Sequence, residues 1–234
     1  MSQDRNPSPK GDDRNLVVVD EDFAQADAED RLWLFWERHR SKIVGSVVAV
    51  VAGLVAFFAY VAWETARREA VGEAYAALAD DDARRAFARE HAGDPLATAA
   101  LLTIADELLA KGKGSSKAYA EAAASDPGPS RAGQALLWRA RLHAGLLALD
   151  EGATADGLAR LAEVAESDAA PDALRGPAFL ALARAALASK DAAKAREWLD
   201  KMDRLLRPDH PWREEQRRLI AAEPALRPAA TPGS

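Results

Sequence analysis

The side chains best suited to chemistry in this chain are its histidines, because imidazole can bind a metal ion or act as a general base near neutral pH. They are widely separated, and none has a second metal-binding residue at the spacing of a known zinc motif: His39, His91, His143 and His210. Cysteine is absent, so the chain has no thiolate ligand, no thiol nucleophile and no disulfide. We therefore interpret the histidines as surface or packing residues and predict neither a metal site nor a cofactor.

Two other groups of polar residues invite a chemical interpretation. Residues 111–117 (KGKGSSK) have the glycines and lysines of a phosphate-binding loop, but they lack the G-x4-G-K-[S/T] order, a preceding strand and a following βαβ unit. Carboxylates such as residues 80–82, Glu163 and Glu166 fall on charged helical surfaces, where solvation is commoner than acid–base catalysis. We interpret the run as a turn between helices, and we predict that the protein is not an enzyme and has no small-molecule substrate.

An uninterrupted apolar segment is the most distinctive element of the chain. Residues 43–63 (IVGSVVAVVAGLVAFFAYVAW) contain no charged side chain over twenty-one positions. At about 1.5 Å of rise per residue, a helix of this length crosses the ~30 Å hydrocarbon core of a bilayer once. The segment is longer than the ~7–15 apolar residues of a cleaved signal peptide, and it begins far from the N-terminus. We predict an uncleaved signal anchor and a single-pass membrane protein.

The residues flanking the anchor predict its orientation. Residues 28–42 form an aromatic-basic juxtamembrane segment, and Tyr60 and Trp63 place aromatic rings at the other end, where such rings prefer the headgroup region. Four basic residues precede the anchor and two closely follow it: Arg31, Arg38, Arg40 and Lys42 before it, and Arg67 and Arg68 after it. Because basic flanks are retained in the cytoplasm, we expect residues 1–27 to form a disordered acidic cytoplasmic tail. The larger C-terminal part is then expected outside the cytoplasm.

Small residues recur every four positions within the anchor, at Gly45, Ala49 and Gly53. Such a series forms a flat strip against which another transmembrane helix can pack. It also arises without function in an alanine-rich chain, so both interpretations stay open.

The sequence after the anchor favours one all-α domain over residues 64–222. Alanine is abundant, Pro and Gly fall mainly between blocks with helical apolar spacing, and β-branched residues are concentrated in the anchor. Asp94 followed by Pro95 predicts a helix start, since the carboxylate can cap free amides and proline suits the first helical position. The net charge of −6 disfavours nucleic-acid binding, which depends on clustered basic residues.

Paired amphipathic segments recur at ~34 residues, the spacing of tetratricopeptide helix pairs. Small or large apolar residues take the positions where paired helices would pack: Trp138, Leu142, Gly145, Leu161, Phe179, Leu182, Ala183, Ala195, Leu199 and Met202. The repeats are degenerate, because 38 residues separate Leu161 from Leu199. We expect a tetratricopeptide-like α-solenoid of about three helix pairs, then a capping helix opened by Pro211 and Trp212. Residues 223–234 are expected to form a disordered Pro/Ala-rich tail.

The order of these parts resembles the YfgM-like family, the ancillary subunits of the bacterial Sec translocon. Three segments carry the resemblance: residues 29–42 (EDRLWLFWERHRSK), 90–109 (EHAGDPLATAALLTIADELL) and 191–202 (DAAKAREWLDKM). The resemblance implies a bacterial inner-membrane protein with its repeat domain in the periplasm. It also implies association with the SecYEG translocon and a membrane-anchored periplasmic chaperone, and it supplies no catalytic residues.

The anchor, its orientation and the repeats together favour a non-enzymatic adaptor or co-chaperone at the export machinery. The alternative is a general cell-envelope scaffold for cell-division or outer-membrane assembly proteins, because helical repeats predict a binding groove and not its ligand. Both hypotheses give the protein two kinds of contact, with protein partners and with the lipid bilayer.

Overall fold

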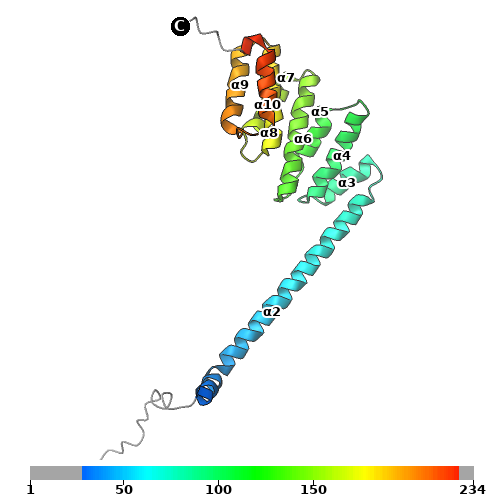
Figure 1. Ribbon diagram of the computed structural model, residues 1–234. Coiled ribbons are helices and arrows are strands. Elements are labelled where there is room, and N and C mark those ends of the chain that lie inside the picture. The colour runs from blue at the N-terminus through cyan, green and yellow to red at the C-terminus, as the bar shows by residue number, and fades with distance from the viewer. Residues whose placement is uncertain (1–27, 227–234) are drawn as a thin grey trace, which may run out of the picture. The chain divides into compact units, whose positions relative to one another are not determined.

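The computed structural model describes residues 28–226, and every regular element in this part of the chain is helical. The elements, which Figure 1 shows in chain order, are α2 (Ala28–Ala76), α3 (Asp81–Glu90), α4 (Pro95–Ala110), α5 (Ser116–Ala123), α6 (Arg131–Asp150), α7 (Thr154–Glu166), α8 (Asp172–Ala188), α9 (Ala192–Leu205), α10 (Trp212–Ala222) and the short 3-10 helix η2 (Pro224–Leu226). The all-α prediction is confirmed for these residues. The predicted acidic tail, residues 1–27, and residues 227–234 of the predicted C-terminal tail lie outside the described residues.

The chain divides into two compact units, residues 1–66 and 67–234. Most of α2 belongs to the first unit, and this part of the helix contains the predicted anchor. Among the described residues, α2 is the one helix long and apolar enough to cross a membrane, over Phe35–Ala76. The large apolar side chains of α2 from Val44 to Trp63 are exposed rather than buried against other helices, whereas Val71 near its end is buried with Phe87 and Ala100.

Five helices of the second unit, α3, α4, α5, α6 and α9, begin where a polar side chain caps a free amide. The carboxylate of Asp80 accepts a hydrogen bond from the Ala83 amide at 2.8 Å, and that of Asp94 accepts one from the Leu96 amide at 2.9 Å. The Asp191 carboxylate caps α9 in the same way. These caps satisfy amides that have no partner inside the helix, and the predicted helix start at Asp94 and Pro95 is confirmed.

From α3 to α9, each helix of the second unit packs on the next helix along the chain. These contacts join α3 to α4, α4 to α5, α5 to α6, α6 to α7, α7 to α8 and α8 to α9, and α4 also meets α6. Two glycines bring α6 and α7 close together, because a Cβ atom at Gly157 would lie 3.0 Å from the carbonyl oxygen of Gly145. The largest core lies among α6, α7, α8 and α9 and contains Phe179 and Met202.

The C-terminal end of the second unit corrects one expectation. Residues 223–234 were expected to be disordered, but Pro224–Leu226 form η2 and the side chain of Leu226 is buried in the largest core. The Arg196 guanidinium also donates a hydrogen bond of 2.6 Å to the Ala225 carbonyl oxygen. The Pro/Ala-rich composition of the segment gave no indication of this turn. One leucine side chain buried in the core is enough to order it.

Candidate protein-binding groove

The predicted repeat-packing residues all lie in the interior of the second unit. All are buried: Trp138, Leu142, Gly145, Leu161, Phe179, Leu182, Ala183, Ala195, Leu199 and Met202. Except for Gly145, which packs against Leu161, they belong to one core cluster. These side chains fix the helices relative to one another, and little of their surface is accessible.

The predicted small-residue strip lies on the exposed surface of α2. Gly45, Ala49 and Gly53 are all exposed, and a Cβ atom at either glycine would meet nothing within 4 Å. The described residues thus provide no helix against the strip, and packing against another transmembrane helix remains a hypothesis.

Three of the four histidines pack against an aromatic ring, two of them stacked and His91 tilted. His39 lies on Phe35, His91 on Phe87 and His143 on Tyr119, with ring centroids 4.5, 4.3 and 5.0 Å apart. Among residues 28–226, no three metal-binding side chains gather closely enough to hold an ion. The arrangement of these three rings therefore agrees with packing roles.

A polar cluster that the sequence pattern did not indicate joins three helices around Asp106. The fully buried Tyr119 of α5 donates a hydrogen bond of 2.6 Å to one Asp106 oxygen, and Arg139 of α6 donates one of 2.7 Å to the other. Burial raises the pKa of Tyr119, so its hydroxyl stays protonated and acts as a donor. Burial and the nearby Arg139 charge lower the pKa of His143. The cluster ties α4, α5 and α6 together.

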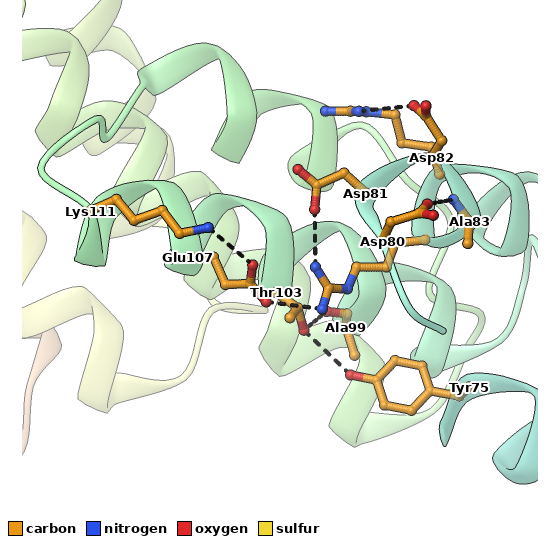
Figure 2. A network of polar contacts seen from close by, with 11 residues as sticks. Tyr75, Asp80, Asp81, Asp82, Ala83, Ala99, Thr103, Glu107 and Lys111 are labelled. Atoms are coloured by element: carbon orange, nitrogen blue, oxygen red, sulfur yellow. Dashed lines mark hydrogen bonds and ion pairs between the residues drawn. The ribbon is translucent and has the colours of Figure 1, made fainter. Parts of the chain in front are cut away.

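The acidic residues at the start of α3 form a second network, which Figure 2 shows. Arg84 lies between the carboxylates of Asp81 and Glu107, at 3.0 and 2.9 Å, and so joins α3 to α4. Tyr75, near the end of α2, has its hydroxyl 3.4 Å from that of Thr103 on α4. Within the fold, the Asp80 carboxylate thus caps α3 and the Asp81 carboxylate pairs with Arg84.

The lysine-glycine run connects α4 to α5, as expected for a turn between helices. The Glu151 carboxylate occupies the start of α5, where it accepts hydrogen bonds from the Ser116 amide at 2.7 Å and the Ser116 hydroxyl at 2.5 Å. The same bonds lower the pKa of Glu151. A carboxylate of the chain itself thus fills the position that a phosphate would take at a helix N-terminus.

An apolar groove of about 410 Å³ lies over α8 between α7 and α9. It is lined by Leu158, Ala159, Ala162, Leu182, Ala185, Ala186, Ser189, Asp191, Lys194 and Trp198. Alanine provides four of these residues, so helix backbones lie close beneath the surface. We call this surface the α7–α9 groove.

Trp198 forms a fixed wall of the α7–α9 groove. The Lys201 ammonium lies 4.3 Å from the centroid of its ring and also forms an ion pair of 2.6 Å with Glu166, which links α9 to α7. Lys194 lies 5.3 Å from the same ring centroid. Cations over the face of an aromatic ring hold it in position. The Trp198 ring is therefore held in position by side chains of the chain itself.

A second hollow, of about 610 Å³, lies between the end of α8, the start of α9 and the end of α10. Arg184 and Lys190 stand on its rim, and neither side chain forms an ion pair within residues 28–226. Leu187 and Leu219 lie in its floor. This hollow is more polar than the α7–α9 groove and has no aromatic side chain.

The chain matches no protein-family model, no curated protein and no solved structure. The arrangement of its own residues must therefore support any functional conclusion.

Proposed function

We propose that this protein is a non-enzymatic membrane-anchored adaptor or co-chaperone that binds other proteins in the α7–α9 groove. The groove carries the proposal, because an apolar floor of small residues is open there beside a preformed tryptophan wall. Aromatic anchors beside well-packed pockets contribute much of the free energy at protein interfaces. The alanines let the backbone of an amphipathic partner helix approach closely, which suits recognition of a helix in a groove.

The cellular setting belongs to the same proposal. The pairs α4 with α5, α6 with α7 and α8 with α9 support a degenerate tetratricopeptide-like arrangement capped by α10. The excess of basic residues before the anchor supports a cytoplasmic N-terminus and a periplasmic domain. The resemblance to the YfgM-like family supports a bacterial inner-membrane location, with SecYEG and a membrane-anchored periplasmic chaperone as partners.

A charge placed in the groove tests this function. Ala159→Glu puts a carboxylate on the exposed wall of the groove, and Ala193→Glu puts one on an exposed site of α9 outside it. Affinity purification from detergent-solubilised membranes should recover SecYEG subunits and a periplasmic chaperone with the wild-type chain. We expect Ala159→Glu to reduce that recovery by at least about tenfold, because a desolvated charge costs more than 1.4 kcal/mol, and Ala193→Glu to leave it unchanged.

The possible outcomes separate the parts of the proposal. Loss of the partners in both variants, or in neither, would remove the groove as the binding site. If the wild-type chain recovered cell-division or outer-membrane assembly proteins instead, the general envelope scaffold would replace the export adaptor. Turnover of any substrate by the purified full-length chain would contradict the non-enzymatic assignment.

A further inference from the structure

The first turns of α2 expose a cluster of large apolar side chains. Leu32, Trp33, Phe35 and Trp36 are each more than half exposed and together line one open surface. Trp rings carry an apolar body and a polar N–H, a combination that favours the interface between membrane and water. Water alone is a poor environment for such a cluster.

Three cations follow this cluster directly. Arg38, Arg40 and Lys42 are exposed and form no ion pair with any side chain that the structure describes. With Glu37 they give residues 37–42 a net charge of +2, since three cations face one carboxylate. After the anchor, Arg67 and Arg68 stand with Glu64 and Glu69 for a net charge of zero, and both arginines have partners. Unpaired positive charge is therefore concentrated before the anchor.

The three cations lie on opposite sides of the helix rather than on one face. At about 100° per residue, Lys42 lies within roughly 40° of Arg38, whereas Arg40 is about 200° away from Arg38. The three exposed rings, Trp33, Phe35 and Trp36, spread over about 160° of the helix circumference at the same angle per residue. A partner protein meets one face of a helix, but lipid headgroups surround it.

The height of the cations along α2 agrees with headgroup phosphates. Arg38 and Lys42 precede Ile43 by five residues and one residue, or about 8 and 2 Å along the axis. The polar region of one leaflet is roughly 5–8 Å thick. Figure 1 shows the first turns of α2, in dark blue, turning away from the line of the rest of the helix.

We propose that residues 32–42 bind anionic phospholipid headgroups, with Arg38, Arg40 and Lys42 contacting the phosphates and the exposed rings seated beside them. This inference rests on the membrane anchoring in the proposed function, but it is independent of the α7–α9 groove. It gives the chain a preference for one lipid class over another. Attraction of juxtamembrane cations to anionic lipid is an established electrostatic effect that salt screens.

Lipid selectivity of the reconstituted full-length chain tests the proposal. Vesicles of phosphatidylcholine with about one-fifth phosphatidylglycerol would carry a spin-labelled probe of either lipid, and electron spin resonance would give the relative association constant. We expect phosphatidylglycerol to be preferred about threefold or more at low salt. Arg38→Gln with Arg40→Gln should reduce that preference by at least half, and the matched pair Arg67→Gln with Arg68→Gln should leave it intact.

Three results would overturn the proposal. Equal association of the two lipids with the wild-type chain would remove the selectivity, and equal loss in the two double variants would make it a property of total charge. Replacement of Trp33 and Trp36 by alanine should weaken the preference too; if it instead released a co-purified protein without changing lipid association, the aromatic cluster would be a protein contact. Flotation of the same vesicles tests anchoring separately, since a chain that inserts without lipid preference refutes only this inference.

Discussion

The two units of this chain place apolar side chains in opposite environments. In α2, Phe57 and Phe58 are about 60% exposed, whereas Phe179 and Leu182 of the second unit are at most 1% exposed. Exposed apolar side chains along a whole helix are stable where lipid replaces water, and the helix satisfies its own backbone groups there. The second unit covers its apolar side chains with neighbouring helices. Apolar content alone therefore does not reveal the fold; the spacing of the apolar residues does.

Glycine shows the same contrast. A Cβ atom at Gly53 would meet nothing within 4 Å, whereas one at Gly157 would lie 2.8 Å from the Leu149 side chain and 3.0 Å from the Gly145 carbonyl oxygen. Gly157 is therefore required by the close crossing of α6 and α7. The open space around Gly53 in α2 is compatible with any neighbour, including lipid.

Removal of an aromatic ring should give the largest difference in unfolding free energy between the two units. Phe179→Ala should lower the free energy of unfolding by about 3–5 kcal/mol, because the ring is fully buried beside Trp198. Phe57→Ala, the matched change in α2, should leave that transition unchanged, because Phe57 is exposed. Urea unfolding of the full-length chain in detergent, followed by circular dichroism, measures both variants. Equal losses would show that the two units share a cooperative core.

Adding one methyl group at a glycine should give the next largest difference in unfolding free energy between the two units. Gly157→Ala should destabilise the second unit by about 1–3 kcal/mol, the usual cost of overpacking, since the Gly145 carbonyl is backbone and cannot move aside alone. Gly53→Ala has open space and should cost nothing in the same urea experiment. A Gly157→Ala chain as stable as the wild type would contradict the close crossing of α6 and α7.

The smallest expected effect is a pH dependence at His143. Its pKa is lowered in the folded chain by burial and by the Arg139 charge, so the unfolded chain binds more protons just below the ordinary value of about 6.5. Stability should therefore fall as the pH drops through 6.5 toward the folded pKa, and no further below it. Thermal melting at pH 7.5 and 5.5 measures this loss, which should be smaller in His143→Gln. The control His210→Gln, outside the cluster, should keep the full loss; identical losses in all three chains would exclude His143 as the source.

Local signals in the sequence predicted much of the fold. Asp94 and Pro95 mark a helix start because capping involves neighbouring residues only. Leu226 escaped prediction because its burial depends on core residues supplied by other helices. The Asp106, Tyr119 and Arg139 cluster escaped for the same reason, since these residues come from three helices and no spacing relates them.

The sequence by itself determined the helical class, the apolar length sufficient to span a bilayer and the excess of basic residues before it. Each follows from neighbours along the chain: rise per residue, helical periodicity and flanking charge. Only the tertiary structure decided where the apolar groove lies. The α7–α9 groove exists because α7 and α9 pack on α8 and leave part of its alanine face open, with Lys201 and Glu166 bridging the two helices beside Trp198. Which part of a helix stays open depends on the packing of distant segments, and hydrophobic periodicity does not encode that choice.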